Sequence, residues 1–268
     1  MYVDAGRFVV RLADCAEDVA AAQRLRYRVF VEEMGATASP EDAAERRERD
    51  RFDPYFDHLL LIDRECPDAD LERGVVGVYR VMRSSVARAG IGFYGAQEYE
   101  LGLLLDYPSE TLELGRSCVD AGYRGGTGMH LLWTGLGHYV AEHDVSILFG
   151  VASFHGTDTS AIAQALSYLH HNHLAPEDLR VRAVADQFTS MDILPEDQVN
   201  RMEALRQIPA LIKAYIRLGG FVGEGAYIDW DFNTIDVCLI MDTARMVERY
   251  RTFYTQAKKP DSTATAAD

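Results

Sequence analysis

Residues Gly122 to Gly128 read GYRGGTG and are the first candidate for chemistry in this sequence. They follow a predicted strand at 111–119 and precede a predicted helix that runs to about His143. A loop that ends a strand and opens a helix exposes backbone N–H groups at the positive end of the helix dipole, so it can bind a phosphate. Arg124 adds a positive charge at its rim. The glycines match neither the P-loop nor the dinucleotide-binding pattern, and a tight turn without a ligand is the alternative.

The elements that would position this loop follow a mixed strand and helix pattern. After the loop, apolar residues recur at the spacing of one helical face, and the next strand is almost continuously apolar, as expected of a strand covered on both sides. The charged run at 45–51 is typical of a solvated helix or loop. In chain order we predict strands at 8–12, 58–63, 74–82, 111–119, 145–151 and within 227–241, and helices at 16–34, after the glycine loop, at 157–171, at 201–218 with a break near Pro209, and at about 243–254.

Composition limits the classes of partner. The chain has 268 residues, with 42 acidic against 27 basic side chains and a formal net charge of −15, which disfavours nucleic acid as a partner. The sequence has no apolar stretch long enough to span a bilayer and no signal-peptide pattern, so we expect a cytoplasmic protein. Its four cysteines lie far apart, and His170, His171 and His173 lack companion ligands at zinc spacing, so we expect free thiols and no metal.

Several longer motifs carry a family resemblance. They read ELGRSCV at 113–119, LRYRVFVEEM at 25–34, FDPYFDHLL at 52–60, FGVASF at 149–154 and PALIKAY at 209–215. Together they resemble the acyltransferases that make lyso-ornithine lipid, which belong to the GNAT superfamily. The resemblance covers roughly residues 8 to 240. It implies an α/β GNAT-like fold, with a mixed central sheet, a splayed strand and helices on both faces.

The resemblance also suggests how the chain is organised. We expect a single acyltransferase domain over 1–256, with a helical insertion at about 157–218. The polar segment 257–268 is predicted to be a disordered tail.

A second resemblance involves single residues at matching intervals. Acyl-homoserine lactone synthases share the fold and place comparable residues around their amino-acid-like acceptor. The matching residues here are Arg26, Phe30, Asp50, Asp53, Arg80, Glu113 and Arg116. Two related families thus indicate one constellation.

Acyl transfer from a thioester to an amino acid gives these residues their expected roles. The ammonium must lose a proton and the carboxylate needs an anchor. We predict Glu113 as the base or relay, Asp53 and Asp57 as acceptors near the amine, and Arg116, Arg80 or Arg26 as the anchor. This assigns Glu113, Asp53 and Arg116 to catalysis, and Arg26, Phe30, Asp50, Asp57 and Arg80 to substrate binding. The alternatives are a structural Glu113–Arg116 ion pair, capping aspartates and a solvated Arg26.

Glu113 and Arg116 can share a site only if their strand is irregular. Residues three apart on a regular strand face opposite sides, and Gly115 between them is a suitable position for a bulge. In the superfamily this strand receives the pantetheine arm of the acyl donor, which we expect at Ser117, Cys118 and Val119. The predicted phosphate contacts are Arg124, Gly125, Gly126, Thr127 and Gly128. Cys118 is expected to be a buried free thiol, not a nucleophile.

These inferences converge on one predicted reaction. A long, 3-hydroxylated acyl chain moves from acyl carrier protein to the α-amine of an amino acid, with ornithine as first choice and glutamine as second. No cofactor is expected beyond the donor's own phosphopantetheine. An acyl-homoserine lactone synthase and a catalytically silent binding module are the alternatives. Since carrier proteins are acidic, docking needs a local basic patch, and peripheral contact with the inner membrane is a further expectation.

Overall fold

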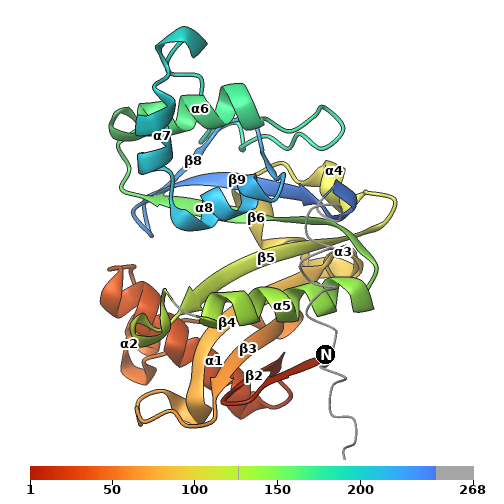
Figure 1. Cartoon of the computed structure of the whole chain (residues 1–268), viewed down its shortest axis with the longest axis vertical. Coiled ribbons are helices and arrows are strands. Elements are labelled where there is room, and N and C mark those ends of the chain that lie inside the picture. Colours follow the sequence, from red (N-terminus) through yellow and green to blue (C-terminus); the bar gives the residue numbers. More distant parts are fainter. Residues whose placement is uncertain (126, 246–268) are drawn as a thin grey trace, which may run out of the picture.

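The computed structural model describes residues 1–125 and 127–245, and one mixed β-sheet forms its centre (Figure 1). Neighbouring strands are antiparallel except β5 and β6, which run parallel. In the described part the order is β1-β2-β3-β4-β5-β6-β9-β7, with β8 also on β9. The strands are β1 Tyr2–Ala5, β2 Phe8–Leu12, β3 Asp57–Asp63, β4 Val75–Arg83, β5 Glu110–Val119, β6 Val145–His155, β7 Phe221–Val222, β8 Tyr227–Asp229 and β9 Thr234–Asp242.

Helices cover both faces of this sheet. α5 lies in front of the N-terminal strands and α1 behind them, while α6, α7 and α8 gather over the β6, β7 and β9 side (Figure 1). The helices are α1 Ala16–Arg26, α2 Pro40–Glu45, α3 Ser84–Val86, α4 Gly102–Leu105, α5 Thr127–Glu142, α6 Ala163–His173, α7 Arg201–Gln207 and α8 Ala210–Arg217. The α/β class, the strand–loop–helix–strand unit and the break at Pro209 are therefore confirmed.

Three predictions differ from the structure. The helix predicted at 16–34 changes to π-helical turns over Tyr27–Glu33. Strand β1 has no counterpart in the predicted elements. The charged run at 45–51 is not simply solvated, because Glu48 and Asp50 turn inward and bind arginines. The helix predicted at 243–254 and the tail at 257–268 lie mostly or wholly outside the described residues.

Strands β5 and β6 diverge halfway along their length. They pair from Glu110 to Glu113 of β5, opposite Val145 to Phe149 of β6. Beyond that point β5 continues to pair with β4, and β6 continues to pair with β9. Gly150 sits where the strands part, and a Cβ there would lie 2.2 Å from the Leu114 carbonyl oxygen. The expected splayed strand is thus present, and it opens a space in the sheet.

A bulge in β5 coincides with this divergence. Val78 of β4 lies opposite Cys118, yet Arg80 lies opposite Gly115, so three steps of β5 match two of β4. The bulge predicted near Gly115 is confirmed, although the residue with positive φ (49°) is its neighbour Arg116. Because of the extra residue, the side chains of Glu113 and Arg116 both line the same cavity.

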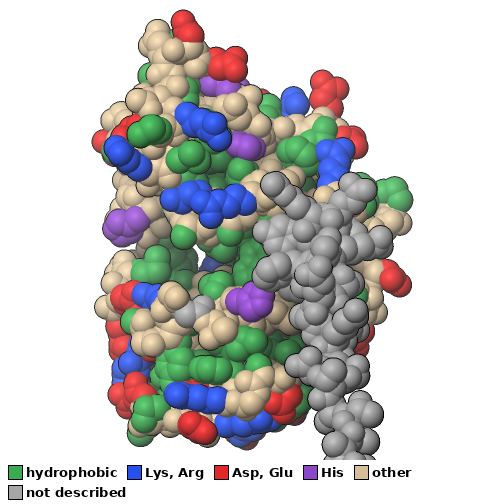
Figure 2. Space-filling model, viewed as in Figure 1, with side chains coloured by type: hydrophobic (Ala, Val, Ile, Leu, Met, Phe, Trp, Pro, Cys, Tyr) green, Lys and Arg blue, Asp and Glu red, His purple; other side chains and the backbone are tan. Residues whose placement is uncertain are grey.

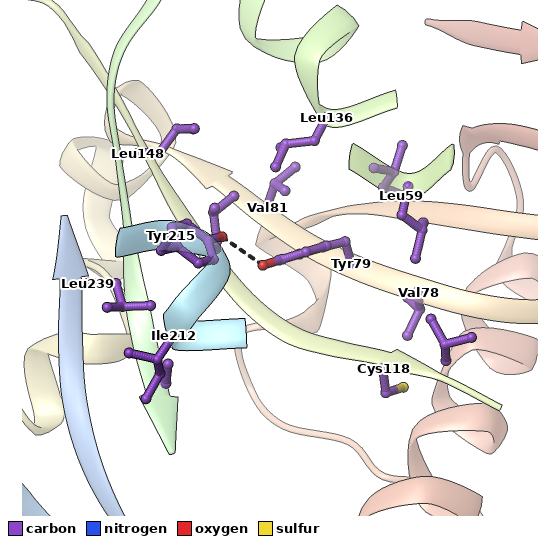
Figure 3. Close-up of a cluster of buried hydrophobic side chains, with 14 of the residues drawn as sticks. Leu59, Val78, Tyr79, Val81, Cys118, Leu136, Leu148, Ile212, Tyr215 and Leu239 are labelled. Atoms are coloured by element: carbon purple, nitrogen blue, oxygen red, sulfur yellow. Dashed lines mark hydrogen bonds between the residues drawn. The ribbon is translucent and has the colours of Figure 1, made fainter. Parts of the chain in front are cut away.

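The core joins the two parts of the sheet across this opening. Tyr79 of β4 and Tyr215 of α8 are buried, and their hydroxyl oxygens lie 2.8 Å apart in a hydrogen bond (Figure 3). The Trp133 ring of α5 packs on Tyr215, with ring centroids 5.0 Å apart. Helices α5 and α8 are therefore held to each other and to β4 on one side of the cavity.

Candidate active site

A cavity of about 410 Å³ lies between the diverging strands. Residues 113–119 of β5 form one wall and residues 151–153 of β6 form the other. Met129 of α5 and Leu211 of α8 contribute from the helices, and the surface is hollowed between these two helices (Figure 2). A small amphipathic substrate and the end of an acyl donor could meet in such a space.

Glu113 is the buried carboxylate of this cavity. Its two oxygens accept hydrogen bonds from backbone N–H groups, one from Gly95 at 2.6 Å and one from Tyr94 at 2.8 Å. Burial raises the pKa of Glu113 to about 7, against the opposing effect of these two donors. A carboxylate with this pKa can take up and release a proton near neutral pH, which suits a general base.

A network of arginines and acids lies under the cavity. Arg26 of α1 is fully buried and donates to both oxygens of Asp53, at 2.8 and 2.9 Å. Arg80 of β4 bridges Asp50 and Asp53, each at 2.7 Å. Burial opposes the charge of Asp53, but Arg26 and Arg80 outweigh it and hold the pKa of that carboxyl well below its usual range. Glu48 completes the network by contacting Arg26 at 2.5 Å.

Among Arg26, Arg80 and Arg116, only Arg116 both lines the cavity and has a partly solvent-exposed side chain. Its side chain is 15 % exposed, whereas those of Arg26 and Arg80 are at most 1 % exposed. Nε of Arg116 donates to Glu48 at 3.0 Å, and Nη2 donates to the Tyr94 hydroxyl at 3.1 Å. Its guanidinium also lies over the Tyr94 and Phe232 rings. Arg116 is thus fixed in orientation by contacts on several sides.

The remaining residues predicted to bind the acceptor fall in different places. Phe30 lines the cavity. Asp50 does not, and it forms an ion pair with Arg80, which does. Asp57 does not line it, because its carboxylate accepts a hydrogen bond from Tyr139 of α5 at 2.5 Å. Asp53 and Arg26 are also absent from the lining, although they contact residues that belong to it.

Only some of the residues predicted for pantetheine lie along the cavity, and Gly125, Thr127 and Gly128 do not line it. Ser117, Cys118, Val119 and Arg124 line it. The Arg124 guanidinium donates to Glu33 at 2.7 Å and to the Val119 carbonyl at 2.8 Å. Gly125 has φ +75°, Thr127 begins α5, and Gly126 lies outside the described residues.

Two of these residues have clear structural reasons for their identity. A Cβ on Gly128 would lie 3.1 Å from Leu61 and 3.3 Å from the Tyr123 carbonyl, so this glycine allows α5 to approach β3 closely. Burial raises the pKa of Cys118 to about 12, so its thiol is neutral at pH 7. This supports the interpretation of Cys118 as a buried thiol and not a nucleophile.

An acidic group in the same cavity was not foreseen from the sequence. Glu98, Asp229 and Asp236 line the cavity, and one carboxylate oxygen of each lies within 4.8 Å of the others. The sequence also gave no sign of Tyr79 and Tyr94, whose rings form part of the lining. A separate group brings Asp192 within 4.0 Å of His170 and His171 at the end of α6, a carboxylate that sequence spacing did not indicate.

The splayed parallel pair, the bulge and the buried carboxylate define an N-acyltransferase with the GNAT fold. The family model described as an acetyltransferase (GNAT) domain matches residues 25–134.

In the part of the chain that the structure describes, there is no helix long and apolar enough to cross a membrane.

Similarity to curated relatives shows to which family of N-acyltransferases the chain belongs. An L-ornithine N(alpha)-acyltransferase of Rhodobacter capsulatus is 53% identical over 93% of this chain and 95% of its own length. The one from Brucella abortus is 44% identical over 93% of this chain and 89% of its own length. The chain belongs to the L-ornithine N(alpha)-acyltransferase family. Among solved structures, the CoA-dependent acyl-homoserine lactone synthase BjaI shares the fold, with a TM-score of 0.50 and 15% identity over 90% of this chain and 83% of that one.

Proposed function

We propose that this enzyme transfers an acyl group from a thioester donor to the α-amine of ornithine. The observation that carries the proposal is Glu113, a buried carboxylate with a pKa of about 7 at the point where β5 and β6 part. Membership of the family supports ornithine as the acceptor, because the curated relatives carry that substrate in their names.

The residues of the cavity support a direct transfer. Glu113 takes a proton from the α-ammonium, and the freed nitrogen attacks the thioester carbonyl carbon. The C–S bond then breaks, and the departing thiolate takes up a proton as the amide forms. Arg116 is placed to anchor the acceptor's carboxylate, since it faces the cavity and offers further N–H donors. In this scheme Arg26 and Arg80 do not touch the substrate. They hold Glu48 and Asp50, which in turn contact Arg116.

We infer that the donor's phosphopantetheine arm lies along Ser117 to Val119. These residues follow the bulge on β5, where the strand has no partner on its β6 side among the described pairings. An extended arm could bind the strand's free edge, as peptides add to sheet edges, and the backbone N–H groups there could polarise the thioester carbonyl. Arg124 borders the same edge and could contact the phosphate after exchanging its contact with Glu33.

We infer that acyl carrier protein docks next to α7 and α8. Lys and Arg side chains gather over these helices, beside the hollow (Figure 2). Arg206 and Arg217 are exposed there, and Leu211 of α8 reaches the cavity. Arg217 has no acidic partner within salt-bridge distance among the described residues, whereas Arg206 lies 3.6 Å from Glu203. Elsewhere on the surface, Arg49 pairs with Asp42 and Arg182 with Glu224. The net charge of −15 therefore does not prevent docking, because steering depends on the local field.

The donor test compares acyl carrier protein with a matched small donor. In the Arg206→Glu/Arg217→Glu double variant, we expect the KM for acyl carrier protein to rise about tenfold and that for the same acyl group on pantetheine to stay unchanged. Added salt should likewise weaken only the carrier-protein reaction. Equal effects on both donors would contradict this docking surface.

The place of action follows from the product. An acylated amino acid is an amphiphile, so we propose a cytoplasmic enzyme with peripheral contact at the inner membrane. Co-sedimentation with anionic and with neutral vesicles tests this. Binding that depends on anionic lipid supports it, and the absence of vesicle binding contradicts it.

The reaction itself is tested with purified protein. Palmitoyl and 3-hydroxypalmitoyl carrier proteins are each incubated with ornithine or glutamine, and products are identified by mass spectrometry. We expect an amide on the α-nitrogen of ornithine. No acylated amino acid from any pair would refute the enzyme function and favour a silent binding module.

A further inference from the structure

Three acids from separate segments meet at one end of the cavity. Glu98 follows the 3₁₀ turn Tyr94–Gln97, Asp229 ends β8, and Asp236 lies on β9 opposite Ser153 of β6. One carboxylate oxygen from each lies within 4.8 Å of the others, and all three residues line the cavity that holds Glu113. We refer to Glu98, Asp229 and Asp236 as the acidic triad.

The acidic triad has no basic partner within salt-bridge distance in the described part of the chain. The neighbouring network contains Arg26, Arg80 and Arg116, whose ion pairs all go to Glu48, Asp50 and Asp53. That network is balanced, with three cations against three anions. The acidic triad therefore leaves one end of the cavity with uncompensated acids, and a ligand with a positive charge would complement it.

Two of the three acids are deeply buried and keep an oxygen without a partner. Glu98 is 6 % exposed and Asp236 is 4 % exposed. Neither Glu98 Oε2 nor Asp236 Oδ1 has a hydrogen-bond partner among the described residues. Buried polar atoms in folded proteins are almost always satisfied, so an orphaned pair facing a cavity indicates a missing donor.

We propose that the acidic triad binds the side-chain ammonium of a diamino-acid acceptor and so selects ornithine over neutral amino acids. This inference rests on the proposed function and names the specificity site within it. A primary ammonium presents three N–H donors. Donor–acceptor distances of about 2.8 Å around a tetrahedral nitrogen separate its acceptors by about 4.6 Å. The triad oxygens all lie within 4.8 Å of one another, so one nitrogen could contact all three.

The acidic triad and the proposed base, Glu113, are both contacted or supplied by the same short loop. A single loop supplies the N–H groups of Tyr94 and Gly95 to Glu113 and also carries Glu98. The reactive α-nitrogen and the side-chain ammonium of ornithine, separated by the α-carbon and three methylene groups, could thus be held from one short segment. Glutamine would place a neutral amide against the triad and leave these acids uncompensated.

The protonation of the free enzyme agrees with this assignment. Burial, followed by the charge of Asp236, raises the pKa of Glu98 well above its ordinary value. Burial raises the pKa of Asp236 to about 6. An ammonium would reverse this preference by favouring the ionised carboxylates. Amide variants should fold well, since they resemble the neutral forms that the empty site favours.

The test compares ornithine with norvaline, which keeps the three-carbon side chain but lacks the ammonium. We measure kcat/KM for both acceptors with one acyl donor in wild type, Glu98→Gln and Asp236→Asn. Each amide variant should lower the ornithine-to-norvaline ratio by about tenfold to a hundredfold, with norvaline turnover nearly unchanged. Asp231→Asn is the matched control, because this exposed acid lies in the β8–β9 turn outside the triad.

Failure of this inference can be told apart from failure of the proposed function. If wild type acylates no amino acid, the proposed function is wrong, and calorimetric binding of ornithine and norvaline to the same variants still tests the triad. A ratio within twofold of wild type in both variants, or equal binding of both ligands by wild type, would overturn the inference. Tight binding of Ca²⁺, Mg²⁺ or Zn²⁺ that both variants abolish would also overturn it, in favour of a metal site.

Discussion

Replacing Glu113 with glutamine changes both the chemistry and the folding of this enzyme. Glutamine keeps the shape but cannot take up the proton. Its carbonyl oxygen can accept one of the two N–H groups from Tyr94 and Gly95, while its NH₂ group faces the other. The variant therefore loses a base and leaves one buried donor unsatisfied.

The effect on stability depends on pH, with a sign fixed by the raised pKa. Burial raises the pKa of Glu113 from 4.5 to about 7. Below pH 4.5 the group is protonated in both folded and unfolded chains and carries no penalty. As the pH rises through 7, ionising it in the fold costs wild type about 3 kcal/mol, at about 1.36 kcal/mol per unit. Glutamine avoids this cost but loses about 1 to 3 kcal/mol for the unsatisfied donor.

The two contributions predict a crossover in urea denaturation. Glu113→Gln should be less stable than wild type at pH 5 and equally or more stable at pH 8. Glu110→Gln is the control, because Glu110 lies on the same strand and accepts from the Ser85 backbone N–H, but it is outside the cavity. Its stability difference should not cross over, since the pKa of Glu110 is lowered in the fold.

Activity gives the second readout. The wild-type kcat/KM should rise with pH, with a midpoint near 7 from Glu113. The acceptor amine's own ionisation should produce a second rise at higher pH. Glu113→Gln should lose this midpoint and about a hundredfold to ten-thousandfold of kcat/KM. A variant within threefold of wild type, or one that keeps the midpoint near 7, would refute Glu113 as the base. A stability difference that is the same at pH 5 and pH 8 would refute the buried ionisation.

Three further predictions test other parts of the site. Cys118→Ala should keep acyl transfer within a few-fold in the product assay, because burial leaves this thiol neutral at pH 7, and loss of all activity would restore a covalent mechanism. Gly150→Ala should lower the free energy of unfolding in urea by about 1 to 3 kcal/mol, since its Cβ would lie 2.2 Å from the Leu114 carbonyl oxygen. Gly137→Ala in α5 is the control, because its Cβ would meet nothing within 4 Å. This control should raise the free energy of unfolding by about 0.5 to 1 kcal/mol. Arg26→Met should cost about 3 to 5 kcal/mol by leaving Glu48 and Asp53 buried beside fewer cations, and a loss below 1 kcal/mol would contradict the network.

Local sequence patterns predicted the strands, loop and helix that carry the site, but not every side chain that lines the cavity. The glycine loop, the bulge near Gly115 and the strands around them follow from residue spacing, because each depends on neighbours in the chain. The acidic triad does not, since Glu98 comes from a loop and the other two acids flank the β8–β9 turn. Only the pairing of β9 with β6 and β8 brings them together.

The choice among the arginines also required the structure. The resemblance to acyl-homoserine lactone synthases indicated Arg26, Arg80 and Arg116 alike as anchors for a carboxylate. Burial separates them, because Arg26 and Arg80 are enclosed and engaged with Asp53. Likewise, nothing in the charged run at 45–51 shows that Glu48 turns inward while Arg46 pairs with Glu32 at the surface.

The balanced arginine–acid network and the acidic triad have different roles around this cavity. In the balanced network, enclosed pairs are costly to desolvate, yet they fix α1, β4 and the bulge of β5 in one arrangement. Arg116 needs that support, because its φ of 49° is strained for a residue with a Cβ and must be held by Glu48 and Tyr94. The acidic triad has no basic partner within salt-bridge distance among the described residues, and burial favours the neutral forms of Glu98 and Asp236 until a cation binds. In the proposed scheme, the rigid network fixes the base, and the triad selects the acceptor by its distant ammonium.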